Sequence, residues 1–90
     1  MWNKPINIGF GSVTLCERIV TVAGVDSAPI KRLITDAKER KVLIDVTHGR
    51  RARSAIFTDS NYIILSAITP ETIAARITED KNENKERENE

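Results

Sequence analysis

The residues best suited to chemistry in this sequence are three arginines in the segment 45–53, which reads DVTHGRRAR. Arginine carries a planar guanidinium that can bind a phosphate, or the guanine edge in the major groove, through two hydrogen bonds. Arg50, Arg51 and Arg53 follow a glycine in a predicted turn between two apolar strands. They are therefore candidate contacts to nucleic acid. Charges in an exposed turn can also be solvated without any ligand, so the triplet alone does not establish a function.

Neighbouring side chains could support such contacts. The hydroxyls of Thr47 and Ser54 could bind phosphate oxygens, and the helical bases Lys31 and Arg32 are further candidates. His48 would be favoured in its charged form beside phosphates, so DNA binding could strengthen as the pH falls. These five residues extend the candidate DNA-binding site around the turn.

The direction of each arginine follows from strand geometry. Alternate residues of an extended segment share a face, so Arg51 and Arg53 should point one way and Arg50 the other, unless the turn twists. Arg53 could then face a neighbouring subunit or an acid such as Asp45.

The sequence contains no comparable set of residues for catalysis or for metal binding. The chain has one histidine, His48, and one cysteine, Cys16, and neither stands in a recognisable pattern of nucleophile and base. The glycines of GFG, residues 9–11, do not complete a dinucleotide or P-loop pattern. No Cys/His cluster exists to hold zinc, and one cysteine cannot form an internal disulfide, which indicates a reducing compartment. We expect no enzyme activity, no cofactor, no metal and no small-molecule ligand.

The charge is divided unevenly along the chain, although the net charge is only +1. Residues 1–78 carry eleven lysines and arginines against seven aspartates and glutamates. Residues 79–90, EDKNENKERENE, carry six acids, three bases and no apolar side chain. We therefore predict a basic folded domain over 1–78 and a disordered acidic tail over 79–90. We expect such a tail to favour solubility, and as an alternative it could compete with an acidic ligand for the basic domain.

Length and composition indicate a single small domain. Of the 90 residues 40% are hydrophobic but only 4% are aromatic, so the core must consist of Ile, Val, Leu and Ala. Few aromatics also disfavour single-strand binding by base stacking. No apolar run reaches the length of about 20 residues needed to span a bilayer, and the N-terminus lacks the pattern of a signal peptide. We expect a cytoplasmic protein with no membrane association.

Hydrophobic periodicity predicts an α+β fold, a small single domain with a mainly antiparallel sheet of about five strands and two helices. A bend at Gly9 and Gly11 should end the first strand, in which Ile6, Ile8 and Phe10 share a face. The last three strands should form an antiparallel meander. A unit of this size leaves apolar surface uncovered, which favours a homo-oligomer. The predicted strands are 6–13, 18–24, 42–46, 54–58 and 62–68, and the predicted helices are 25–41, capped by Asp26 or Ser27, and 70–78, capped by Thr69.

Four segments resemble the RemA family of bacterial extracellular-matrix regulators. They are INIGFGS, SAPIKRLITDAKER, LIDVTHGRRARSAIFTDS and IILSAITPETIAARI, and the similarity runs from about Ile6 to Ile77. The resemblance implies a DNA-binding transcriptional regulator of biofilm matrix that assembles into a ring-shaped homo-oligomer of about seven or eight subunits. It also implies that Arg18, Arg50 and Arg51 contact duplex DNA. His48, Ala52 and Lys41 depart from the family pattern, in which Tyr, Thr and Gly are common, but none of them removes a basic residue.

Two other functions are compatible with a basic surface. The chain could be a structural or protein-interaction module that binds an acidic protein, or it could bind RNA. The sequence does not specify target genes, the operator, the ring order or whether the regulator activates or represses.

Overall fold

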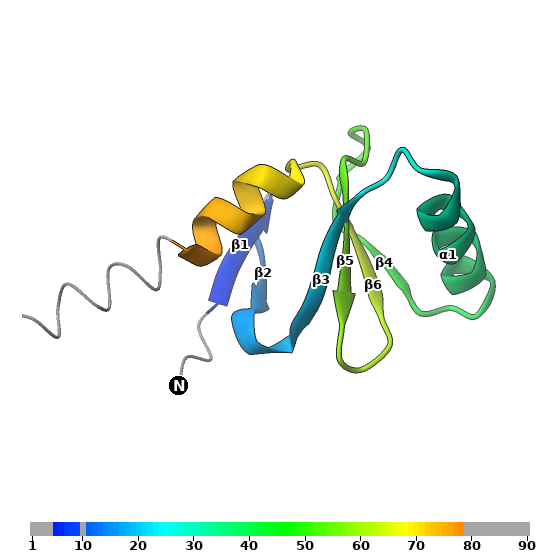
Figure 1. Ribbon diagram of the computed structural model, residues 1–90, viewed down its shortest axis with the longest axis horizontal. Coiled ribbons are helices and arrows are strands. Elements are labelled where there is room, and N and C mark those ends of the chain that lie inside the picture. Colours follow the sequence, from blue (N-terminus) through cyan, green and yellow to red (C-terminus); the bar gives the residue numbers. More distant parts are fainter. Residues whose placement is uncertain (1–4, 10, 79–90) are drawn as a thin grey trace, which may run out of the picture.

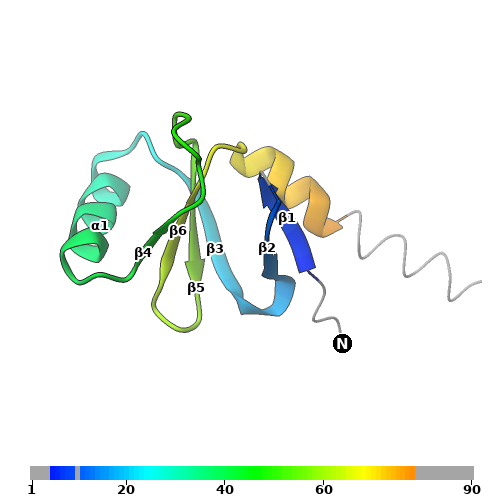
Figure 2. The same ribbon diagram turned by 180° about the vertical axis from the view of Figure 1, so that it is seen from behind.

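A four-stranded sheet forms the centre of the computed structural model, which describes residues 5–9 and 11–78 (Figure 1). The strand order is β3-β5-β6-β4. On one face lies helix α1, and on the other lie the hairpin β1-β2 and a second helix over residues 70–78, as the reverse view also shows (Figure 2). The bounds are β1 Pro5–Gly9, β2 Ser12–Leu15, a 3-10 turn Cys16–Arg18, β3 Ile19–Gly24, α1 Ala28–Glu39, β4 Leu43–Asp45, β5 Ser54–Thr58 and β6 Ile63–Ser66.

The predicted fold class is confirmed, with two differences in the strands. The first predicted strand is a hairpin, so there are six strands in the described chain, because Gly9 and Gly11 take φ values of 121° and 82° and reverse the chain. The predicted meander is wrong in one pairing, because β4 pairs parallel with β6 and not with β5. β5 instead lies between β3 and β6 and pairs antiparallel with both. Phe10, a predicted core residue, and the predicted tail over 79–90 lie outside the described residues.

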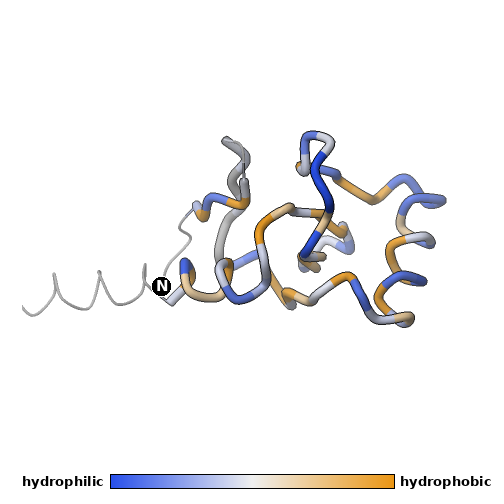
Figure 3. The backbone as a smooth tube through the Cα atoms, turned by 90° about the horizontal axis from the view of Figure 1, so that it is seen from above, coloured by the Kyte–Doolittle hydropathy of each residue, from blue (hydrophilic) through white to orange (hydrophobic). Residues whose placement is uncertain are grey.

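The centre of the sheet is covered on both faces, which explains why β5 and β6 read as continuous apolar runs. Ile56 and Ile64 pair across β5 and β6 and pack with Ile8 and Ile73 beneath the hairpin and the second helix. The residues of β5 and β6 that alternate with these isoleucines face α1. Figure 3 shows hydrophilic and hydrophobic positions alternating along α1. Two core clusters thus lie on opposite sides of one sheet. The α1-side cluster contains Ala37, Ala55 and Ile63, with Val25, Ile30, Ile34, Val42, Leu43, Phe57 and Leu65 packed against it.

The second helix begins at the residue expected from its capping pattern. Thr69 Oγ1 accepts a hydrogen bond from the Thr72 backbone N–H at 3.3 Å and donates one to Thr72 Oγ1 at 3.0 Å. Thr72 thus partly replaces the glutamate of a capping box. At α1 the N-cap is Ser27, with extended backbone but no side-chain capping bond, and Pro29 lies in the first turn.

Lys41, which follows α1, provides a test of backbone strain. It has a φ of 62°, a conformation that glycine adopts freely and other residues adopt at a cost. We expect Lys41→Gly to raise the free energy of unfolding by about 0.5–1 kcal/mol. Urea denaturation checks this. Lys41→Ala is the control, because it removes the same charge but keeps the strain, and an equal gain from alanine would contradict the explanation.

Candidate nucleic-acid interface

The loop of residues 46–53 joins β4 to β5 and carries the three arginines. Both of its ends are bound to β6, through Val46 N–H to Leu65 O at 3.0 Å and Arg53 N–H to Ser66 O at 2.8 Å. Two hydrogen bonds to a central strand make this a well-anchored loop.

The tip of this loop is a tight turn. His48 and Gly49 take φ values of 54° and 82°, and the Arg50 N–H donates to Thr47 O at 3.1 Å. Glycine adopts the positive φ that this turn requires at residue 49 without steric cost. Because two consecutive residues are left-handed, the chain leaves the extended conformation immediately before the arginines.

Asp45 stabilises the start of the loop. Its Oδ1 accepts hydrogen bonds from the Thr47 hydroxyl at 2.6 Å and from the Thr47 backbone N–H at 2.8 Å. These two bonds lower the pKa of Asp45 below its ordinary value of 3.8, partial burial opposes the shift, and nearby His48 adds to it. The Asp45 carboxylate is therefore an internal partner of Thr47.

The lowered pKa of Asp45 predicts how stability depends on pH. A carboxyl group whose pKa is lower in the folded than in the unfolded state stabilises the fold fully above its unfolded value. That contribution should be lost as the pH falls below about 3.8 and through the lower folded value. Asp45→Asn should cost about 1 kcal/mol at pH 7, because an amide accepts these bonds less strongly, and little at pH 2.5. Urea denaturation at both pH values measures the difference, and an equal cost at both would contradict this role.

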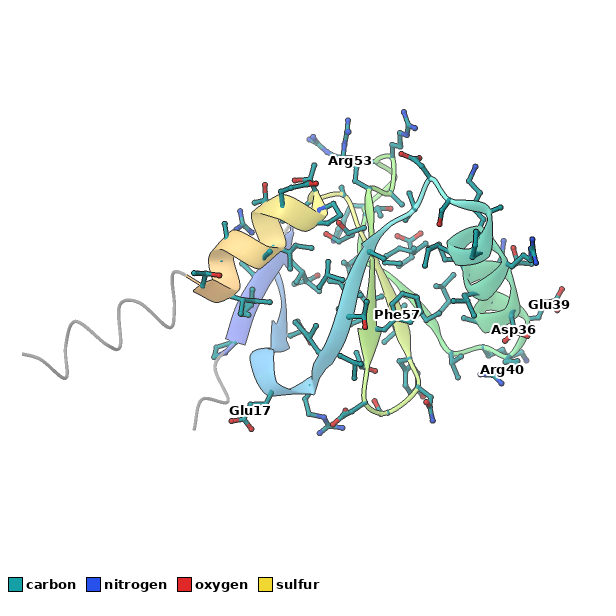
Figure 4. The ribbon with its side chains drawn as sticks, viewed as in Figure 1. Glu17, Asp36, Glu39, Arg40, Arg53 and Phe57 are labelled. Carbon is teal, nitrogen blue, oxygen red and sulfur yellow. The ribbon has the colours of Figure 1, made fainter. Side chains whose placement is uncertain are left out.

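The structure brings Arg50, Arg51 and Arg53 together. With Ala67 they line one open hollow of about 350 Å³ at the loop end of the sheet. Figure 4 labels Arg53 there, directed away from the sheet. Residues 51–53 are irregular and β5 begins only at Ser54, so strand geometry alone does not fix the directions of these side chains. All three arginines line this hollow, as the alternative of a twisted turn allows.

A second hollow adjoins the first. It has a volume of about 390 Å³, and Arg51 and Arg53 line it too, together with residues 24–26 and 69–71. Across it Arg51 Nη2 lies 3.7 Å from Asp26 Oδ1. Both side chains are largely exposed, so the pair contributes little to stability and Arg51 can exchange Asp26 for another anion. Sequence reasoning assigned Asp26 only a capping role, because the contact joins segments distant in the chain.

Lys31 and Arg32 lie at the same end of the molecule as the loop. They occupy the first two turns of α1, and Asp26, two residues before that helix, is the residue that Arg51 contacts. Both side chains are exposed. They can extend a basic surface from the loop along α1.

Arg18 lies at the other end of the sheet. It precedes β3, whose first residue Ile19 pairs with Thr58 at the end of β5, whereas the arginine loop enters the start of β5. At about 3.3 Å per residue the distance along β5 from Arg53 to Asp59 is roughly 20 Å. Arg18 Nε is bound to Asp59 Oδ1 at 2.7 Å. Within one subunit Arg18 therefore does not share a contact with the loop arginines.

Two predicted auxiliary contacts are corrected by their burial. Ser54 is fully buried and its hydroxyl donates to the Ile68 carbonyl, while Thr47 is buried and donates to Asp45. A buried hydroxyl that already donates a hydrogen bond within the protein is not accessible to a phosphate. Thr47 and Ser54 shape the loop, and we remove them from the candidate contacts.

Comparison with known proteins assigns the family. The family described as RemA-like, Extracellular matrix regulatory protein A-like, matches residues 6–77. The chain belongs to the RemA-like family. The loop 46–53, β5 and most of the second helix all lie within that match.

Two relatives match nearly the whole chain. A protein of Brevibacillus brevis is 49% identical over 83 residues, which are 92% of this chain and 96% of the relative. A protein of Alkaliphilus metalliredigens is 55% identical over 83 residues, 92% of this chain and 88% of the relative. Both carry the name "Putative regulatory protein". These names and the family description indicate a regulatory protein, as the sequence predicted, rather than an enzyme.

Among the helices of residues 5–9 and 11–78, none is long and apolar enough to cross a membrane. Over the same residues, no group of three or more His, Cys, Asp or Glu side chains is arranged to hold a metal ion.

Proposed function

We propose that this RemA-like protein is a DNA-binding transcriptional regulator whose arginine loop contacts the phosphates of duplex DNA. The observation that carries the proposal is the gathering of Arg50, Arg51 and Arg53 around one open hollow on a loop bound at both ends to β6. The backbone of a well-anchored loop loses little conformational freedom on binding, and each guanidinium group that it carries can form two hydrogen bonds with a phosphate.

The basic surface extends beyond the loop. Lys31 and Arg32 supply further charges on the α1 side, and His48 at the tip of the loop is a further candidate contact. Arg18, at the far end of β3, would contact a separate stretch of DNA or a stretch held by a neighbouring subunit.

Self-assembly would raise the affinity of these contacts for DNA. A single loop neutralises few phosphates and binds weakly, whereas a ring of about seven or eight copies presents the same loop repeatedly to one polymer. The second contact then forms at a high effective concentration, and affinity rises by orders of magnitude without any new type of contact. Such a ring would prefer long or bent duplexes to short fragments. We further propose that the protein acts in the cytoplasm on matrix genes, in keeping with the family description.

A competition experiment tests the DNA contact. Labelled duplex DNA bound to the protein is challenged with unlabelled duplex, structured RNA and polyglutamate of equal charge, at several salt concentrations. We expect only the duplex to compete efficiently, and affinity to fall steeply with salt as counterions are released. Equal competition by polyglutamate would favour a protein-interaction module, and stronger competition by RNA would favour an RNA-binding protein. Either outcome would overturn the proposal.

A further inference from the structure

Three of the four large hydrophobic side chains that are exposed in the described chain line two hollows beside α1, one at β3 and one at the turn between β5 and β6. Val20, 66% exposed, and Leu33, 46% exposed, line a hollow of about 550 Å³ with Ile30 and Phe57. Leu33 and Phe57 also line an adjoining hollow of about 210 Å³ with Tyr62, which is 41% exposed. Both hollows are lined by Leu33, Phe57, Thr58 and Asn61, so they form one continuous depression with an apolar wall. We call it the β3 groove and define it by Val20, Ile30, Leu33, Phe57 and Tyr62.

Val20 faces this groove because of an irregularity in β3. Ile19 pairs with Thr58 and Thr21 pairs with Phe57, so Val20 is the extra residue of a β-bulge. Ile19 and Val22 pack on the hairpin side of the sheet. The bulge turns Val20 away from that core and onto the α1 side, as bulges commonly redirect a side chain.

The strand beside the groove is an open edge. β3 pairs only with β5 among the described strands, and its sequence IVTVAG contains neither a charge nor a proline. Natural edge strands usually carry such residues, which prevent unwanted strand pairing. An unprotected edge next to an apolar groove indicates a surface that another protein chain covers.

The rim of the groove resembles that of a protein interface. Asp59 at one end is bound to Arg18, and Asp36 at the other lies 3.4 Å from Arg40 in a second ion pair. An apolar centre with a polar rim is typical of protein contacts. Because these rim charges are paired within the subunit, the groove has little attraction for a nucleic acid. The segment 79–90 has no apolar residue and cannot fill it.

The fourth exposed hydrophobic residue lies on the opposite edge of the sheet. Ile44, 42% exposed, lies on β4, which forms the opposite edge of the same sheet and pairs only with β6 among the described strands. The molecule thus has an apolar groove on one margin and an exposed aliphatic side chain on the other. Two different patches that fit each other generate a head-to-tail contact, which closes into a ring when the rotation allows.

We propose that the β3 groove receives the β4 edge, with Ile44, of a second copy of this chain. This inference rests on the assembly part of the proposed function and not on its DNA contact. It assigns a separate surface to each task, with assembly along the two margins of the sheet and DNA binding at the loop end.

Complementation between two variants tests the contact. Val20→Glu disables the groove and Ile44→Glu disables the β4 edge, so each purified variant should have the native mass of one chain. Mixed in equal amounts, they should form a dimer and nothing larger, because the intact edge of one fits the intact groove of the other. Ala75→Glu, which adds the same charge to an exposed site on the second helix, should keep the mass of the parent assembly.

Several results would overturn the inference. One such result is an unchanged native mass for either variant, including the case in which Val20→Glu dissociates the assembly and Ile44→Glu does not. Another is a mixture of the two variants that stays monomeric. If circular dichroism shows that Val20→Glu is unfolded, Leu33→Glu replaces it, since Leu33 lines the same groove from α1. A monomeric parent protein would refute both this contact and the ring. Salt-dependent binding of the variants to duplex DNA, measured separately, still decides the role of the arginine loop.

Discussion

Replacing Arg50 and Arg51 together by alanine is expected to weaken binding to duplex DNA by about 100-fold or more at a salt concentration of about 0.15 M. Both side chains line the hollow at the loop tip, and their loss removes two of its three guanidinium groups. The slope of the logarithm of affinity against the logarithm of salt concentration should become shallower by about two for each subunit that contacts DNA. Fluorescence anisotropy with a labelled duplex measures both quantities.

The matched control for this variant carries the same change in charge elsewhere. Lys38→Ala with Lys41→Gly removes two positive charges at the end of α1 near Ile63, where β6 begins, far from the arginine loop. Glycine suits the backbone of residue 41, so the fold should tolerate the change. We expect only a small loss of affinity in this control. Equal losses in the two double variants would mean that DNA responds to net charge alone. Unchanged binding by an Arg50→Ala, Arg51→Ala protein of native mass would refute the loop assignment.

The second large effect concerns the core. Ile56 is fully buried on the central strand β5, where it pairs with Val22 and Ile64 and packs with Ile8 and Ile73. We expect Ile56→Ala to lower the free energy of unfolding by about 3–4 kcal/mol, because it removes three carbons from a site enclosed by rigid elements. This is a large fraction of the stability of a small domain, about 5–15 kcal/mol. Urea denaturation gives the value.

A graded series checks the explanation for Ile56. Ile56→Val removes one carbon and should cost about 1 kcal/mol, so the urea concentration at the midpoint of unfolding should fall from the parent to the valine variant and again to the alanine variant. Unfolding of the alanine variant at the same urea concentration as the parent would show that the site collapses around the smaller side chain. Binding to DNA at low temperature, where the variant is still folded, should stay unchanged, because Ile56 lies in the interior and does not reach the loop surface.

Local elements were largely predictable from the sequence, because their signals lie within a few residues. The helix α1 follows from the spacing of Ile30, Ile34 and Ala37, and the second helix from its threonine cap. The positive φ at Gly49 follows from its place in a turn. Leu33 is an instructive exception, because it fits the same helical spacing and yet is 46% exposed at the groove. Periodicity identifies an apolar face but not what covers it.

Long-range pairings were not predictable. β5 and β6 are apolar on both faces, so no alternation indicates which neighbours they take, and the parallel pairing of β4 with β6 depends on how α1 and the loop 46–53 direct the chain. The burial of the Thr47 and Ser54 hydroxyls was not predictable for the same reason. Nothing near Ser54 in the sequence shows that its partner is the Ile68 carbonyl, fourteen residues away.

The candidate site, like the fold, was predictable from the sequence only in part. The sequence by itself determined which side chains are available, namely a cluster of arginines after a glycine in a basic domain, and its resemblance to RemA proteins indicated their use. Only the tertiary structure decided that Arg50, Arg51 and Arg53 surround one hollow while Arg18 lies at the opposite end of the sheet. The kinds of side chain are a local property of the chain, whereas their distances depend on strand order, and strand order is set by burial on both faces of the sheet.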